Sequence, residues 1–142
     1  MNLSEHFTLD EFTHSQVALR TGASNDPPIE LVPVLKRTAQ GLEAVRTLLG
    51  DKPINISSGY RSPMVNNLVG SKPSSQHLTG QAVDFTCPSF GNPAAIVRRI
   101  VSSGIEYDQC ILEFNAWVHI SFSDKPRRYA LIIDSTGTRA YA

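Results

Sequence analysis

The stretch Ser75-Gln76-His77-Leu78-Thr79-Gly80-Gln81-Ala82-Val83-Asp84-Phe85 carries the strongest signal in this chain of 142 residues. Its apolar second half predicts a strand, and its polar first half predicts a loop that ends in a tight turn at Gly80. Asp84 lies between Val83 and Phe85, where an unpaired carboxylate would be costly and a metal ion is one group that compensates it. We expect the turn to bring His77 close to Asp84, although a spacing of seven residues is weak evidence alone.

A third polar side chain, His119, lies within the apolar run Trp117 to Phe122. Taken alone, a strand histidine is more often a hydrogen-bonded structural residue than a metal ligand. Together, His77, Asp84 and His119 offer the two imidazoles and the carboxylate that suit Zn²⁺. A catalytic zinc site keeps three protein ligands and leaves the fourth position to water. These residues therefore predict one Zn²⁺ per chain.

Length and composition indicate one globular domain over residues 1–142. An apolar content of 41% and a charged content of 18% are ordinary for such a domain. Thirteen basic and thirteen acidic residues cancel, which gives no support for nucleic-acid or membrane-surface binding. No apolar run approaches the roughly 18 residues that span a bilayer. We expect a monomer with no nucleic-acid partner and no membrane insertion.

The N-terminal residues, about 1–25, predict a short helical segment. Thr8-Leu9-Asp10-Glu11 is a capping box that follows the apolar Phe7. The first ten residues carry acids and a histidine where a secretory signal would carry Lys or Arg and an apolar stretch. We expect synthesis in the cytoplasm without a signal peptide, so that another factor must deliver the protein if its substrate lies outside the membrane.

The order of the remaining elements predicts an α+β fold. The main helix is expected from near Asp26-Pro27 to Gly50, with Pro33 kinking its first turns or delaying its regular start. A second helix should open at Asn92-Pro93 and end at Gly104. Strands are expected at residues 54–57, 82–85, 109–114, 117–122 and 129–133, with a polar, turn-rich stretch from 58 to 80. Helices followed by adjacent strands favour a mainly antiparallel sheet with helices packed on it.

Cys87 and Cys110 are expected to be buried thiols. Each lies beside or within an apolar run, and they are too far apart to resemble a zinc-ligand pair.

Four segments, taken in order, resemble the D-Ala-D-Ala carboxypeptidase family of zinc peptidases, which shares its fold with the hedgehog signalling domain. They are Ser57-Ser58-Gly59-Tyr60-Arg61-Ser62-Pro63, then Asn66, then Ser75-x-His77-x-x-Gly80-x-Ala82-x-Asp84-Phe85, and finally Trp117-Val118-His119-Ile120-Ser121. The opening Leu3 to Phe12 also resembles the start of small phage-type members. The resemblance implies a hedgehog/DD-peptidase-like fold and hydrolysis of bacterial cell-wall peptides.

The resemblance also implies roles for individual residues. His77, Asp84 and His119 match the metal ligands of the family. Arg61 matches an arginine near the metal that holds substrate oxygens, a task suited to a planar guanidinium; without the motif it would be taken as a solvated loop cation. Ser75 matches a serine that orients a ligand or a substrate group, and a simple loop hydroxyl is the alternative.

The general base is where this sequence departs from its relatives. Many members place an acid three residues before the last histidine ligand, and Ala116 stands there instead. Glu113 is the nearest earlier carboxylate. A hairpin turn at Asn115-Ala116 would set Glu113 opposite Val118, beside the strand of His119, where it could act as the base. The weaker alternatives are Asp108 and Asp124.

The sequence therefore predicts a zinc metallopeptidase that acts on the stem or cross-link peptides of peptidoglycan. A terminal D-Ala-D-Ala bond, a D-Ala cross-link and an L-Ala-D-Glu bond all remain open as the bond cut. The phage-like start favours a lysin released through holin pores or carried in a virion, and a bacterial prophage copy is equally compatible. The alternative is a catalytically inactive, zinc-containing module that binds cell wall or serves as a phage structural protein, for which Ala116 leaves room.

Overall fold

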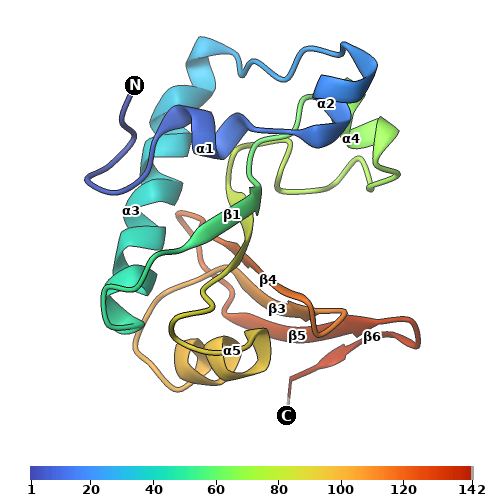
Figure 1. The fold of residues 1–142 in the computed structure, drawn as a ribbon. Coiled ribbons are helices and arrows are strands. Elements are labelled where there is room, and N and C mark those ends of the chain that lie inside the picture. Colours follow the sequence, from blue (N-terminus) through green and yellow to red (C-terminus); the bar gives the residue numbers. More distant parts are fainter. Residues whose placement is uncertain (142) are drawn as a thin grey trace.

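The computed structural model describes residues 1–141, in which short N-terminal helices and one long helix precede most of a six-stranded sheet (Figure 1). The helices are α1 (Leu9–Thr13), α2 (Gln16–Thr21), the 3₁₀ turn η1 (Ile29–Leu31), α3 (Val32–Leu48), α4 (Pro63–Leu68) and α5 (Pro93–Val101). The strands are β1 (Asn55–Ser58), β2 (Ala82–Thr86), β3 (Gln109–Glu113), β4 (Trp117–Ser121), β5 (Tyr129–Asp134) and β6 (Gly137–Ala140). None of these helices has the length and apolar character needed to cross a membrane.

The strand order is β1-β2-β4-β3-β5-β6, and every neighbouring pair is antiparallel except the parallel pair of β3 and β5. The expected α+β class with a mainly antiparallel sheet is therefore confirmed.

The hairpin between β3 and β4 differs from the expected register. Glu113 pairs with Trp117 and not with Val118. The connection spans the three residues Phe114 to Ala116, one more than expected. Phe114 and Asn115 both adopt positive φ angles, 52° and 55°, and Ala116 N–H closes the turn onto the Glu113 carbonyl. Positive φ at both central residues is the hallmark of a type I′ turn, whose twist matches that of the strands.

Local signals explain most of the helix boundaries. The Thr8 capping box of α1 is present as expected. The regular part of α3 begins only at Val32, because Pro33 is tolerated in a first turn and not further inside a helix. In the stretch expected to be turn-rich, Ser62 caps the short helix α4, whose Pro63 stands at a favoured first position. The elements α4 and β6 were not anticipated, whereas α1 and α2 both lie within the expected N-terminal helical segment.

The hydrophobic core lies on one face of the sheet. In Figure 1, α5 lies below the sheet, where it packs against β3 and β4. Alternate residues of these strands point to this side and are buried, namely Cys110 and Leu112 on β3 and Val118 and Ile120 on β4. Both cysteines are buried and free, as expected. Because successive strand side chains point to opposite faces, Ile111 and His119 point to the other face of the sheet.

Candidate metal centre

Two of the predicted ligands lie side by side on adjacent strands. Asp84 on β2 pairs directly with His119 on β4, so their side chains project from the same face of the sheet. His119 Nδ1 lies 3.0 Å from Asp84 Oδ1. The register of the sheet therefore sets the position of both groups.

His77 reaches the same place from the loop before β2. Gly80 adopts a φ of 76°, and its N–H bonds to the His77 carbonyl, which makes the tight turn expected there. Thr38 of α3 holds this turn by donating its hydroxyl to the Gly80 carbonyl at 2.6 Å. As a result His77 Nε2 lies 3.3 Å from Asp84 Oδ1.

The orientation of the His77 ring is set by the end of β1. Its Nδ1 lies 2.6 Å from the Gly59 carbonyl oxygen, so Nδ1 carries the proton and Nε2 remains available as a ligand. A Cβ at residue 59 would clash with the Phe12 carbonyl, and Tyr60 N–H donates to that same carbonyl at 2.7 Å. Only glycine permits this close approach of the chain to α1.

The three side chains fit a divalent metal ion such as zinc. Their donor atoms all lie within 4.8 Å of one another. Ligands bonded at about 2.0–2.1 Å in a tetrahedral site are roughly 3.3 Å apart, close to the nitrogen–oxygen separations on Asp84. Burial alone would raise the pKa of Asp84, but hydrogen bonds from His119 and His77 outweigh it and hold this pKa well below its usual range. The carboxylate is therefore ionised, as a ligand must be.

Glu113 lies beside this cluster. The observed register places it two residues from Ile111, the partner of His119, and thus on the same face of the sheet. Its Oε1 is 3.6 Å from His119 Nδ1. Burial, reinforced by the charge of Asp84, raises the pKa of Glu113 above its ordinary value. A carboxyl group with a raised pKa beside a metal site is suited to proton transfer at neutral pH.

Arg61 and Ser75 line the same cleft. Arg61 N–H donates to the His77 carbonyl, and the side-chain Nε is buried without a hydrogen-bond partner among residues 1–141. Burial lowers the pKa of Arg61, and the nearby charges of Asp84 and Glu113 oppose this shift. Ser75 Oγ accepts a hydrogen bond from His77 N–H at 3.2 Å. Ser75 thus helps to position the loop that presents His77.

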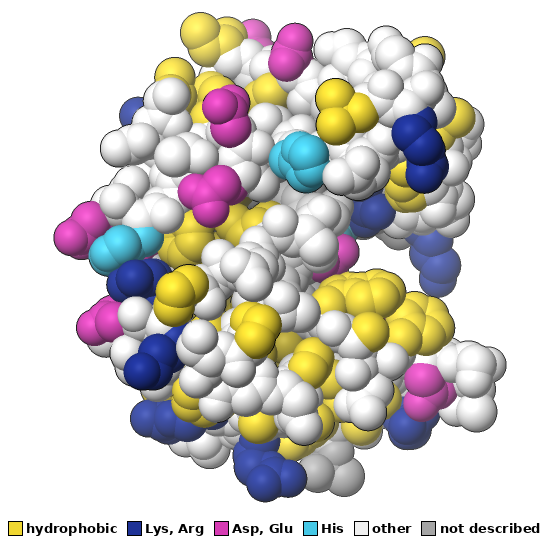
Figure 2. Space-filling model, in the orientation of Figure 1, with side chains coloured by type: hydrophobic (Ala, Val, Ile, Leu, Met, Phe, Trp, Pro, Cys, Tyr) yellow, Lys and Arg dark blue, Asp and Glu magenta, His cyan; other side chains and the backbone are white. Residues whose placement is uncertain are grey.

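The cleft around these residues has a volume of about 910 Å³. Its floor is the face of the sheet opposite the core, and its wall is the segment from Val69 to His77. Figure 2 shows the molecule hollowed on the right, between the part that carries α4 and the strands below it. Of the acidic residues in the described chain, Asp84 and Glu113 line this cleft.

The two weaker base candidates lie elsewhere. Both carboxylate oxygens of Asp108 are already occupied, by hydrogen bonds from Arg127 and from Gln76 Nε2. Asp124 is exposed and pairs with Arg37 at 2.6 Å. Neither lines the cleft, so the geometry favours Glu113.

The Asp108 ion pair predicts a pH dependence of stability. Hydrogen bonds from Arg127 lower the pKa of Asp108 to about 2, whereas a free aspartate titrates near 3.9. The stabilisation is therefore complete above about pH 4 and should be lost as the pH falls toward 2. In metal-free protein, Asp108→Asn should lower the free energy of unfolding by about 1–3 kcal/mol at pH 6 and by much less at pH 2. Urea denaturation at both values measures this, and an equal difference at both would contradict it.

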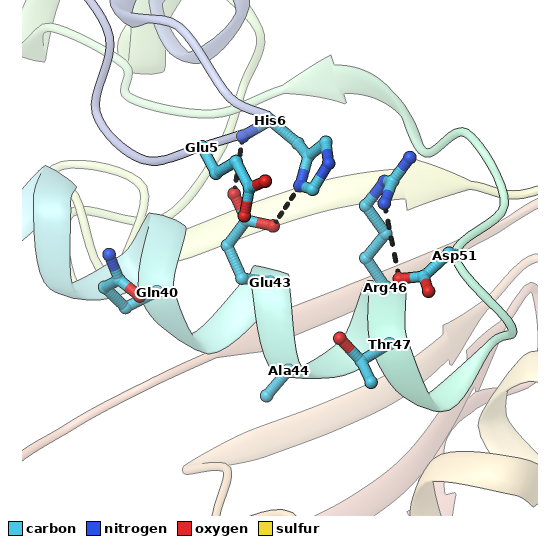
Figure 3. A pocket seen from close by; sticks show the side chains of 8 residues that line it. All are labelled: Glu5, His6, Gln40, Glu43, Ala44, Arg46, Thr47 and Asp51. Atoms are coloured by element: carbon cyan, nitrogen blue, oxygen red, sulfur yellow. Dashed lines mark hydrogen bonds and ion pairs between the residues drawn. The ribbon is translucent and has the colours of Figure 1, made fainter.

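A second pocket, of about 780 Å³, lies outside the metal centre (Figure 3). There Glu43 of α3 accepts hydrogen bonds from the Ser4 hydroxyl, from His6 N–H and from the His6 ring. These bonds attach the N-terminal segment to α3, which gives His6 a packing role.

Two imidazoles and a carboxylate, supplied by the sheet and by the loop before β2, meet in one cleft with a second acid and an arginine beside them. Metal-dependent hydrolases use sites of this type. The family model for Peptidase M15 matches residues 5–121, and the chain belongs to this family. Over 50 residues it is 42% identical to the zinc D-Ala-D-Ala carboxypeptidase of Streptomyces albus G. That match covers 35% of this chain and 20% of the relative. The family expected from the motifs is confirmed.

Proposed function

We propose that this protein is a zinc-dependent peptidase that hydrolyses peptide bonds of bacterial peptidoglycan. The observation that carries the proposal is the cluster of His77, Asp84 and His119 beside Glu113, in a chain that belongs to a peptidase family. The named activity of the partial relative supports the substrate class.

His77, Asp84 and His119 would hold one Zn²⁺. When bound, the ion supplies a Lewis acid that polarises a carbonyl and makes water easier to deprotonate. Glu113 takes the proton of the attacking water and passes it to the leaving amine, a role that its raised pKa supports. Arg61 holds a carboxylate or carbonyl oxygen of the substrate, and Ser75 keeps the His77 loop in place.

The alternative, a zinc-containing module without catalysis, rests on Ala116 at the position that many relatives fill with an acid. Ala116 closes the β3–β4 turn, whereas the Glu113 carboxylate lies 3.6 Å from His119. A carboxylate is thus available near the cluster from another position, which favours the enzyme. We also propose that the protein reaches the wall through holin pores or in a virion, on the likeness of Leu3 to Phe12 to phage-type members.

The experiment that tests the function is digestion of purified peptidoglycan followed by mass spectrometry of the products. Loss of a terminal D-alanine identifies a carboxypeptidase, and release of cross-linked or stem fragments identifies an endopeptidase. A zinc-loaded protein that binds the wall without releasing any new amine would establish the binding module instead.

Arg61→Lys should reduce activity by well over tenfold. Lysine keeps the positive charge but loses the planar pair of donors that holds carboxylate or carbonyl oxygens. Steady-state hydrolysis, with circular dichroism to verify the fold, measures the effect. Wild-type activity in this variant would mean that Arg61 does not hold the substrate.

A further inference from the structure

The cleft extends beyond the metal centre to a second fixed cation, Arg127. On β3, Ile111 pairs with His119, and Gln109 lies two residues before Ile111 on the same face of the sheet. Gln109 in turn pairs with Tyr129 of β5. Arg127 precedes Tyr129 by two residues. Tyr129 therefore lies about 6.5–7 Å along the sheet from the row of paired residues that contains His119. Arg127 lies in the loop before β5, and its two-residue link to Tyr129 adds at most about 7 Å, so that Arg127 is roughly 7–14 Å from this row.

Asp108 and Tyr129 hold the Arg127 guanidinium in one orientation. Its Nε and Nη2 donate to the two oxygens of Asp108 at 2.8 and 2.6 Å, and its backbone N–H donates to the same carboxylate. The guanidinium also lies 4.8 Å from the centre of the Tyr129 ring. The Asp108 side chain is only 3% exposed, whereas that of Arg127 is 47% exposed. Asp108 therefore serves as an anchor, and the guanidinium remains open to the cleft.

The outer edge of this guanidinium has unused donors. Nη1 has no hydrogen-bond acceptor within the described chain, and Nη2 uses only one of its two hydrogens on Asp108. These two nitrogens form the fork that grips a carboxylate with two parallel hydrogen bonds. Because Asp108 and Tyr129 already immobilise the side chain, little conformational freedom would be lost when an anion binds.

The charges along the cleft favour an anionic ligand. Arg61, Lys72 and Arg127 line it, and the acids on its surface, Asp84 and Glu113, both lie at the metal centre. When the buried Asp108 is included, cations and acids balance, and a bound divalent metal ion would leave the cleft positive.

We propose that Arg127, oriented by Asp108, binds a free carboxylate of the substrate at a distance from the scissile bond. This inference rests on the proposed peptidase function and makes Arg127 a determinant of specificity for acidic peptides. An extended peptide advances about 3.3–3.6 Å per residue, so the carboxylate belongs two to four residues from the bond that is cut.

Matched synthetic peptides test this proposal. Each ends in D-alanyl-D-alanine and carries either glutamate or glutamine at the second, third or fourth residue before the scissile bond. For at least one position, wild-type kcat/KM should be about tenfold or more higher for the glutamate peptide, the range of a charge-assisted hydrogen bond. Arg127→Gln should bring that ratio close to one by raising KM for the glutamate peptide. The control Arg37→Gln breaks another Arg–Asp pair, outside the cleft, and should leave the ratio unchanged.

The outcomes separate the inference from the proposed function. An unchanged ratio in Arg127→Gln, or an equal loss on both peptides, would mean that Arg127 only supports the fold. If the wild type hydrolyses none of these peptides, the D-alanyl-D-alanine bond is not its target, and the digestion of whole peptidoglycan described above decides the peptidase proposal. Calorimetric binding of the same pairs to zinc-loaded protein then still tests Arg127. A preference for glutamate that Arg127→Gln removes supports the carboxylate site, and equal affinities in the wild type overturn it.

Discussion

Glu113→Gln is expected to reduce peptide hydrolysis by about 10²–10⁴, the usual contribution of a positioned acid–base group. Glutamine has nearly the shape of glutamate but cannot accept the proton of the attacking water. Glu113 is not among the three clustered ligands, so zinc content should stay at the wild-type level. The loss should appear mainly in kcat, because the change affects proton transfer more than binding. Release of D-alanine or of new amines from peptidoglycan measures it.

The matched control is Glu106→Gln, an exposed acid on the segment before β3. It should retain wild-type activity. Asp108→Asn would be a poor control, because it removes a buried partner of Arg127. If Glu113→Gln remained active, the general base would be another group, and the role proposed for Glu113 would be wrong.

Removing a metal ligand should have the other large effect. The wild type should contain about one zinc per chain after purification without chelator. His77→Ala and His119→Ala should each weaken zinc binding by more than about 100-fold. Loss of a residue that only hydrogen-bonds to a metal ligand already costs roughly 10–100-fold in metal affinity, and loss of the ligand itself should cost more. Hydrolysis should fall to background. Zinc should also raise the Tm of the wild type and not that of the variants, since an ion that binds only the folded state stabilises it.

Metal analysis by atomic emission and thermal denaturation with and without added zinc measure these effects. His14→Ala, which changes an exposed histidine of the N-terminal segment, is the control and should keep the metal. Full zinc occupancy in both ligand variants would rule out the metal site proposed here.

Several features could be predicted from the sequence because their signals are local. The Thr8 capping box, the apolar runs of β2 to β5 and the glycine turn at residue 80 depend on neighbours a few residues away. Asp84 and His119 could be identified as candidate ligands because each is a polar residue within an apolar strand, where a buried polar or charged group needs a compensating partner. The segments α4 and β6 gave weaker signals, since one is a single short helix and the other is a polar, exposed edge strand.

What only the tertiary structure decided is which polar groups meet across the sheet. The identity of the turn residues did not reveal that both Phe114 and Asn115 would take a positive φ, and the turn they form accompanies the register that brings Glu113 to the face of His119. Likewise, Asp108 and Glu113 are both strand-end acids in the sequence. Arg127, far along the chain, engages Asp108, whereas Glu113 is left facing the cleft. Contacts of this kind depend on backbone geometry and on partners from distant segments, which local sequence patterns do not encode.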